Sequence, residues 1–169
     1  MDNDQRQEPI LRISDVEPQD RYVGFVDILG WGDKVKTDFA AALELYDNLI
    51  NIFEMPPEID DGSFSMRIVS DSIMLICSKV TPIAMACNLL QHGALAYDCL
   101  LRGGIAFGKH IELVHKNNYY VLSEPLVHAA MLEKQIKAPC IAFHPSAIPQ
   151  FDYEELLSAS PFMRLILYF

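Results

Sequence analysis

The chain has 169 residues, of which 51% are hydrophobic and 21% charged, a composition that fits one folded domain with a buried core. Its 23 acidic and 13 basic residues give a formal net charge of −10. A general nucleic-acid coat needs a basic face, so this balance argues against one, whereas a metal–nucleotide ligand stays compatible because the cation cancels part of its charge.

The first elements in chain order are a polar arm, a strand and a helix. We expect residues 1–20 to form the arm and residues 21–169 to form a single domain. Residues 21–30 are apolar nearly throughout, as in a strand covered on both faces, and glycines break this strand at its end. A helix is predicted over about residues 38–53. Its apolar face consists of Phe39, Leu43, Tyr46, Leu49, Ile50 and Phe53.

The middle of the chain is predicted to form a pair of strands followed by a helix. Two strands, 64–69 and 72–78, are joined by a tight turn at Ser70 and Asp71. A second helix is expected to be capped by Thr81, with Pro82 at its first position. It is predicted to run to about Leu101 and to stop at Gly103-Gly104, where the two glycines are also expected to allow a close approach of backbone.

The remaining elements are a strand, a hairpin, a helix and a last strand. A strand is predicted over 104–108, and a hairpin pairs 111–114 with 119–122. Ser123 and Pro125 open a helix that runs to about residue 137, and residues 139–143 form a strand. This order predicts an α+β sandwich with a ferredoxin-like βαββαβ core and a mostly antiparallel sheet. The apolar run 160–169 is either a terminal strand or the point at which the chain is truncated.

The four cysteines are Cys77, Cys87, Cys99 and Cys140, and their spacing is not that of a metal site. We predict buried free thiols, which favour a reducing compartment. The N-terminus has no apolar targeting core, and no apolar stretch is long enough to span a bilayer. We therefore expect a cytoplasmic protein that binds neither nucleic acid nor membrane.

Two aspartates, Asp27 and Asp71, stand inside apolar strand-like runs. A desolvated carboxylate is unfavourable unless something compensates it, and where two converge a divalent metal is the commonest compensation. In a ferredoxin-like sheet the first strand lies beside the middle hairpin, so the two side chains are expected to meet. With the Ile28 carbonyl as a further ligand, they would bridge two cations. The alternatives are a strand-end cap for Asp27 and a plain turn residue for Asp71.

A candidate phosphate site follows the first strand. The residues Leu29, Gly30, Trp31 and Gly32 would expose backbone amides able to cradle a triphosphate, although plain turn glycines are an equal alternative. Arg102 is a second candidate for phosphate contact, against the alternative of a helix-end cation. Two metals beside an amide cradle favour in-line attack on a phosphorus atom.

Four segments resemble the catalytic domain of class III nucleotidyl cyclases. They are Val-Asp-Ile-Leu-Gly-Trp at 26–31, Ser-Asp-Ser-Ile at 70–73, Leu-Arg-Gly-Gly-Ile-Ala-Phe-Gly at 101–108, and the helix over 123–133. The first three of these segments are most similar in sequence to the bacterial pyrimidine cyclases of Pycsar antiphage defence. The resemblance implies conversion of UTP, or secondarily CTP, to cyclic UMP or cyclic CMP and pyrophosphate. It also implies a homodimer with shared active sites, two Mn²⁺ or Mg²⁺ ions per site, and an effector that the cyclic nucleotide activates.

The resemblance has departures at the positions that complete the family's site. The family has an Asn and an Arg that stabilise the transition state. The corresponding positions here are Val127 and Met131, whose side chains cannot stabilise it. The family also has an acid and a lysine that recognise the purine base. They correspond to Tyr120 and to a position near Arg67 here, so we expect these two residues to recognise a base other than adenine. A cyclase-like module that binds nucleotide without catalysis is one alternative. Another two-aspartate nucleotidyl transferase, such as a palm-type polymerase or a cyclic dinucleotide synthase, is a second.

Overall fold

The computed structural model describes residues 12–51, 64–116, 118–151 and 154. Most of the expected polar arm and the terminal run at 160–169 lie outside these residues. A short 3₁₀ turn, η1 (Ile13–Asp15), precedes the first strand, and a second, η2 (Ile148–Gln150), comes near the end.

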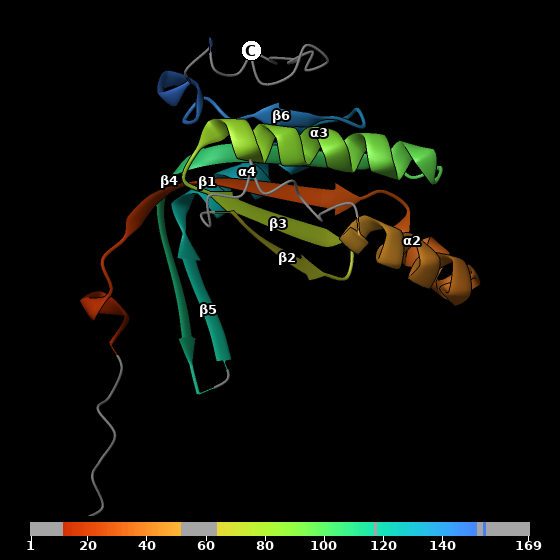
Figure 1. The fold of residues 1–169 in the computed structure, drawn as a ribbon, viewed down its shortest axis with the longest axis horizontal. Coiled ribbons are helices and arrows are strands. Elements are labelled where there is room, and N and C mark those ends of the chain that lie inside the picture. Colours follow the sequence, from red (N-terminus) through yellow and green to blue (C-terminus); the bar gives the residue numbers. More distant parts are fainter. Residues whose placement is uncertain (1–11, 52–63, 117, 152–153, 155–169) are drawn as a thin grey trace, which may run out of the picture.

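A mixed sheet forms the centre of the molecule, in the order β2-β3-β1-β4-β5, with β6 paired to β4 (Figure 1). The β4–β6 pair is parallel, and the other pairs are antiparallel. The strands are β1 (Gln19–Ile28), β2 (Ser65–Val69), β3 (Ser72–Cys77), β4 (Leu101–His115), β5 (Asn118–Ser123) and β6 (Ile141–Phe143). The α+β, mostly antiparallel ferredoxin-like arrangement is confirmed, and β1 lies beside β3 as predicted.

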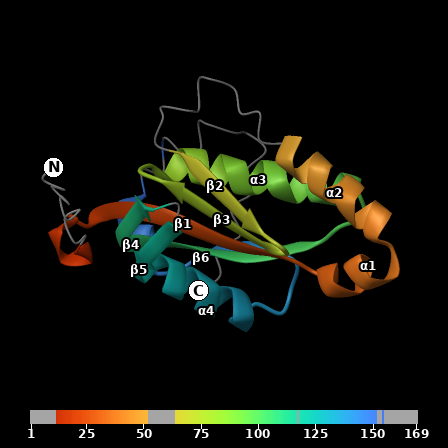
Figure 2. The same cartoon turned by 90° about the horizontal axis from the view of Figure 1, so that it is seen from below.

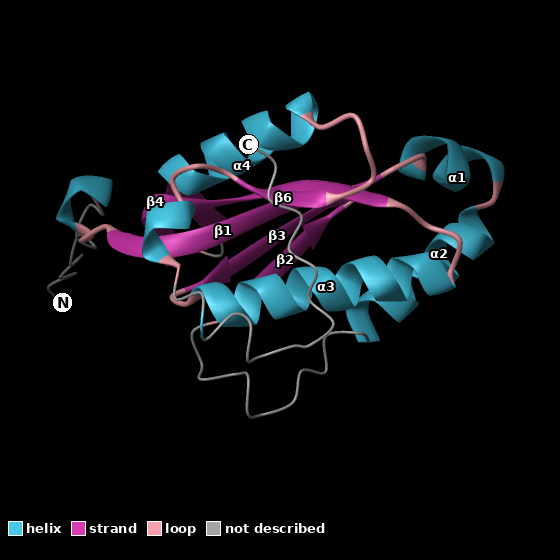
Figure 3. Ribbon diagram, turned by 90° about the horizontal axis from the view of Figure 1, so that it is seen from above, coloured by secondary structure: helices cyan, strands magenta, loops and turns pink. Residues whose placement is uncertain are grey.

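Helices cover the two faces of the sheet unequally. Helix α3 (Val80–Ala96) lies along one face and α4 (Glu124–Gln135) along the other, while α1 (Trp31–Thr37) and α2 (Phe39–Asn51) follow the end of β1 (Figures 2 and 3). The main core lies between α3 and the sheet. Its fully buried side chains include Val26, Ile28, Leu75, Ile83 and Leu90.

The face opposite α3 is covered only in part, because α4 packs mainly on β4 and β1. Side chains alternate along each strand, so the burial of Val26 and Ile28 against α3 directs Phe25 and Asp27 to the other face. The register then places Arg67, Met74 and further residues on that same face. We call it the open face and define it by Phe25, Arg67, Met74, Glu112 and Tyr119.

Some predicted boundaries are wrong for identifiable reasons. Asp38, which was predicted as the first residue of a helix, instead caps the helix that begins at Phe39, because its Oδ1 accepts from the Ala41 amide at 3.0 Å. Helix α1 before it was missed. It begins after Gly30, which has the left-handed φ of 75° that glycine adopts readily.

Helix α3 is shorter than predicted. It begins at Val80 without a side-chain cap, so Thr81 is not its cap, and it ends at Ala96. Gly103 and Gly104 therefore lie inside β4 and do not stop a helix. The close approach predicted for them is confirmed, since a Cβ at Gly104 would lie 2.5 Å from the carbonyl oxygen of Ala129 on α4. The separate strands predicted at 104–108 and 111–114 are one continuous strand.

The predicted cap of α4 and the predicted free state of the cysteines are confirmed. The Ser123 hydroxyl accepts from the Leu126 amide at 3.1 Å and caps α4, with Pro125 in the first turn. The cysteines are free, three of them buried and Cys140 half-buried. Among the described residues, none of the helices combines the length and the apolar character needed to cross a bilayer.

Candidate active site

Asp27 and Asp71 lie at one corner of the sheet. Asp27 is next to last in β1, where the register pairs it with Ser72 of β3 and Arg102 of β4. Asp71 lies in the tight turn between β2 and β3, and its carbonyl accepts a 2.9 Å hydrogen bond from the amide of Ile28. The end of β1 is therefore tied directly to the turn that carries the second acid.

The electrostatics of this corner are unfavourable to a carboxylate. The pKa of Asp27 is raised above its ordinary value, first by burial and then by the negative charges of Asp71 and Glu133, while Arg102 opposes the shift. Asp71 thus lies near enough for its charge to act on Asp27. A bound cation would relieve this repulsion.

The donor chemistry fits a hard divalent cation. Both side chains offer carboxylate oxygens, which Mg²⁺ and Mn²⁺ prefer. The described part of the chain contains no group of three His, Cys, Asp or Glu residues able to hold a metal. Mg²⁺ commonly binds through only one or two carboxylates together with water and substrate phosphates, so Asp27 and Asp71, with the Ile28 carbonyl, suffice for such an ion.

Arg102 has a buried partner that the sequence did not reveal. Its Nε donates to Glu133 Oε1 at 2.6 Å, and Glu133 on α4 is only 4% exposed. A terminal nitrogen of the same guanidinium lies 3.9 Å from Asp27 Oδ2. Arg102 lies in β4, so the alternative of a helix-end cation is wrong. The available signal for Glu133 was its place four residues after Ala129, which is buried on the packed face of α4.

The predicted phosphate loop is only partly a loop. The Leu29 amide donates to the Leu100 carbonyl at 3.0 Å and so already has a sheet partner. Gly30 and Gly32 are exposed, and a Cβ at either would meet no atom within 4 Å. Trp31 is buried and begins α1. The amides still suited to an anion are those around the first turn of α1, whose N–H groups have no acceptor within the helix.

The two predicted base-reading residues do not lie together. The Arg67 guanidinium carbon stands 5.1 Å from the centre of the Tyr119 ring, within cation–π range. Tyr120 is the next residue of β5 and points to the opposite face of the strand. Strand periodicity alone could not choose between the two tyrosines, because the choice depends on which face β5 turns towards the open side.

Tyr119 has a second partner, Glu112, in addition to Arg67. Its hydroxyl donates to Glu112 Oε1, and its pKa is raised to about 12, by burial first and then by Glu112. Arg67 and Tyr119 border a cavity of about 280 Å³ on the open face. The other lining residues are Phe25, Ile68, Val69, Ser72, Met74 and Leu126.

Helix α4 exposes two apolar side chains, at the positions of Val127 and Met131. Val127 is 58% and Met131 55% exposed, one helical turn apart. Their chemistry excludes hydrogen bonding to a phosphate. They leave an apolar patch on the solvent side of α4.

Comparison with known proteins shows which solved structures have a similar fold. No family model matches the sequence, and no curated protein does. Among solved structures, a bacterial light-regulated adenylyl cyclase superimposes with a TM-score of 0.59 at 16% identity, covering 81% of this chain and 47% of that one. The adenylyl cyclase CyaB from P. aeruginosa gives 0.55 at 15%, covering 85% and 82%.

A third similar structure is the guanylate cyclase domain of RhGC from Catenaria anguillulae in complex with GTP. It superimposes with a TM-score of 0.55 at 14% identity, covering 81% of this chain and 85% of that one. The chain spans about half of the light-regulated enzyme but most of the two other proteins. The chain thus has the fold of a class III nucleotidyl cyclase catalytic domain.

Proposed function

We propose that the protein is a nucleotidyl cyclase that converts a pyrimidine nucleoside triphosphate, UTP in preference to CTP, to its 3′,5′-cyclic monophosphate and pyrophosphate. The observation that carries this proposal is the meeting of Asp27 and Asp71 at one sheet corner of a cyclase fold. In that position the charge of Asp71 acts on the Asp27 carboxylate, and a bound cation would offset it. The start of α1, which follows β1 directly, is able to receive phosphate.

Each residue of the corner has a role in the proposed reaction. Asp27 and Asp71, with the Ile28 carbonyl, hold two Mn²⁺ or Mg²⁺ ions, which when bound supply activation of the ribose 3′-hydroxyl and neutralise triphosphate charge. The hydroxyl oxygen attacks the α-phosphorus in line, its proton is released, and the bond to pyrophosphate breaks. The amides of Gly30, Trp31 and Gly32 hold the outer phosphates, and Arg102 adds positive charge at the same corner.

The base is assigned to the cavity beside Arg67 and Tyr119. A guanidinium donates hydrogen bonds to carbonyl oxygens, and uracil offers two such acceptors, whereas cytosine offers one. The Tyr119 ring supplies a flat surface for stacking. Because Tyr120 lies on the other face of β5, we assign its proposed role to Tyr119.

The proposed active assembly is a homodimer with shared sites. Apolar side chains are exposed on the open face and on α4, at Val69, Val114, Val127 and Met131. A second copy that covers these side chains would bring its own base-reading pair towards the aspartate corner. The resemblance of three sequence segments to Pycsar cyclases supports a role for the product as a second messenger that activates an effector in antiviral defence.

The direct test is turnover with each of the four ribonucleoside triphosphates and Mn²⁺. Pyrophosphate release is measured and the nucleotide product is identified by mass spectrometry. Cyclic UMP is the expected main product. Asp27→Ala and Asp71→Ala should each abolish release, since each removes a ligand. Asp20→Ala, an exposed acid at the other end of the same strand, should keep it. Full turnover in either site variant contradicts the proposal.

A second candidate rests on Val127 and Met131. Because neither side chain can stabilise a transition state, the domain would bind nucleotide without converting it. Saturable binding of UTP with no pyrophosphate release favours this candidate. A linear or dinucleotide product would instead indicate another class of nucleotidyl transferase.

A further inference from the structure

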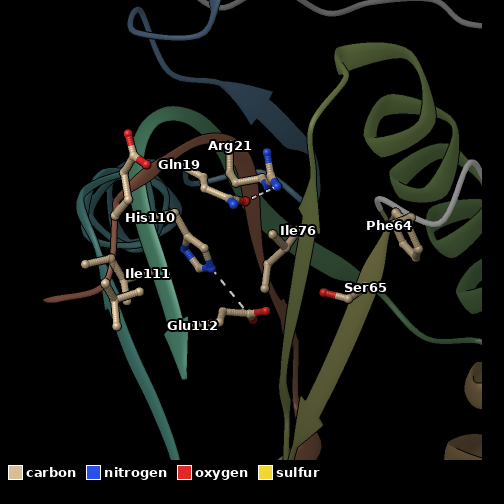
Figure 4. A pocket seen from close by; sticks show the side chains of 10 residues that line it. Gln19, Arg21, Phe64, Ser65, Ile76, His110, Ile111 and Glu112 are labelled. Carbon is tan, nitrogen blue, oxygen red and sulfur yellow. Dashed lines mark hydrogen bonds and ion pairs between the residues drawn. The ribbon is translucent and has the colours of Figure 1, made fainter. Parts of the chain in front are cut away.

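A second cavity lies at the opposite end of β1 from Asp27. It encloses about 340 Å³, and its walls come from the segment before β1 and from β1, β2, β3 and β4 (Figure 4). The lining residues are Val16, Glu17, Gln19, Arg21, Phe64, Ser65, Ile76, His110, Ile111 and Glu112. None of them belongs to the aspartate corner or to the cavity of Arg67 and Tyr119. The cavity is therefore a separate place on the molecule, of the size that small ligands occupy.

His110 supplies the most unusual feature of this cavity. It is only 5% exposed, and among the described residues neither ring nitrogen has a hydrogen-bond partner. Its Nε2 points towards Glu112 (Figure 4), but the 3.6 Å separation from Oε1 exceeds a hydrogen bond. A buried polar atom left unpaired is unfavourable by about 1–3 kcal/mol. Two such atoms on one ring call for a group that satisfies them.

The protonation state of His110 fixes what that group must offer. Burial lowers the pKa of the imidazole, with Arg21 adding to the shift and Glu112 opposing it, so the ring is neutral at pH 7. A neutral imidazole has one donor and one acceptor nitrogen. The complementary ligand therefore presents both an acceptor and a donor.

The charges around the cavity disfavour an anion. Glu17 and Glu112 contribute two carboxylates against the single guanidinium of Arg21. That guanidinium is already engaged, since one terminal nitrogen donates to the Asp20 carbonyl at 3.1 Å and the other to Gln19 Oε1. Apolar walls from Phe64, Ile76 and Ile111 favour contact with a flat, uncharged body.

We propose that this cavity binds a small uncharged heterocycle of the nucleobase or nucleoside class, with His110 donating one hydrogen bond to it and accepting another. The Ser65 hydroxyl and the Glu112 carboxylate face the same space (Figure 4) and offer a further donor and acceptor. Because Glu112 also accepts from Tyr119, it lies between this cavity and the neighbouring one. The proposal stands independently of the cyclase assignment.

Calorimetric titration of the full chain with uridine, cytidine, adenosine and guanosine tests the proposal, in EDTA so that no divalent metal contributes. At least one nucleoside should bind with a Kd below about 1 mM. His110→Phe keeps a flat ring but removes both nitrogens, and Ser65→Leu fills the space. Each should weaken binding at least about tenfold. The 5′-monophosphate of the same nucleoside should bind more weakly than the nucleoside, because the carboxylates repel it.

His92→Phe, which makes the same change at an exposed histidine of α3, is the matched control and should retain binding. Circular dichroism checks each variant, and if His110→Phe does not fold, Ser65→Leu alone decides. The proposal is overturned if no nucleoside binds, or if the variants of this cavity bind as tightly as His92→Phe. Turnover is not measured in this experiment, so its failure leaves the proposed cyclase activity untouched.

Discussion

Asp27 is half-buried at the end of a strand, close to two other acids. Its folded pKa lies above the ordinary value of 3.8, so the folded state disfavours the carboxylate relative to the unfolded chain. The stability that protonated Asp27 contributes is fully present below that ordinary pKa and is lost as the pH rises through the raised one. A side chain that lowers stability at neutral pH is typical of a functional site.

The first prediction concerns this unfavourable charge. Asp27→Asn should raise the melting temperature of the metal-free protein at pH 7, because it removes a charge that burial, Asp71 and Glu133 all oppose. The gain should disappear at a pH low enough to protonate Asp27 in the native protein. Differential scanning calorimetry in EDTA measures both values. Asp20→Asn, on the exposed part of the same strand, should bring no gain, and a lower melting temperature for Asp27→Asn contradicts the electrostatic account.

The second prediction concerns the ion pair beneath the site. Arg102→Met should lower the free energy of unfolding by about 3 kcal/mol, because it leaves Glu133 buried without its partner. Lys109→Met breaks an exposed pair with Asp20 of 2.9 Å and should cost no more than about 1 kcal/mol. Urea unfolding gives both values. Equal effects would show that burial does not distinguish the two pairs.

At the level of elements, the contact of α4 with β4 holds the site together. It places Glu133 against Arg102, which in turn lies near Asp27. The approach is close at Gly104, where a Cβ would meet the Ala129 carbonyl oxygen and, at 3.1 Å, the Leu132 Cβ. Neither backbone can yield easily, so the absence of a side chain at Gly104 is a packing requirement.

The third prediction follows from that contact. Gly104→Ala should destabilise the fold by about 2 kcal/mol through overpacking. Gly32→Ala, inside α1 with open space around it, should instead stabilise by about 0.5 kcal/mol through the unfolded chain. Chemical unfolding of the two variants provides the comparison. A neutral Gly104→Ala would mean that α4 is free to move away from the sheet.

Element order was predictable from the sequence because it rests on local signals. Each of these signals is contained in a few neighbouring residues: the apolar run of β1, the turn at Ser70 and Asp71, and the cap at Ser123. At Gly103-Gly104 the predicted helix stop is wrong and the predicted close approach is right, because glycine serves both purposes and only the position of α4 decides between them. Helix α1 was missed because its start, Gly-Trp-Gly, has the composition of a loop.

At the candidate corner the sequence pointed to Asp27, Asp71 and Arg102, but not to the partners around them. Asp27 and Asp71 stood out because charge is rare in apolar strands. Glu133 and Tyr119 did not, since their importance depends on partners in other elements and on which face β5 turns inward. His110 has no spaced partner along the chain, and its cavity arises only when β1, β2 and β4 come together.

At the level of the whole molecule, the two faces of the sheet are covered unequally. One face has α3 and a complete core, whereas the other exposes apolar side chains next to the candidate base cavity. Exposed apolar groups clustered near a site mark an interaction surface. The proposed second copy accounts for them.

The fourth prediction tests that assembly. The double variant Val127→Glu with Met131→Glu should shift the protein from dimer to monomer in analytical ultracentrifugation, because two charges cannot be buried in an apolar contact. Pyrophosphate release should fall with the dimer. Leu95→Glu, equally exposed but on α3, should change neither. A double variant that stays dimeric and active contradicts the proposed interface.

The central claim is that Asp27 and Asp71 hold metal ions together, and counting bound Mn²⁺ by electron paramagnetic resonance tests it most directly. With a non-hydrolysable UTP analogue present, we predict two ions per active site for the unmodified protein and for Asp20→Ala. Asp27→Ala and Asp71→Ala should each lose both ions while remaining folded. An unchanged count of bound Mn²⁺ in either variant would show that the two acids do not form a common metal site.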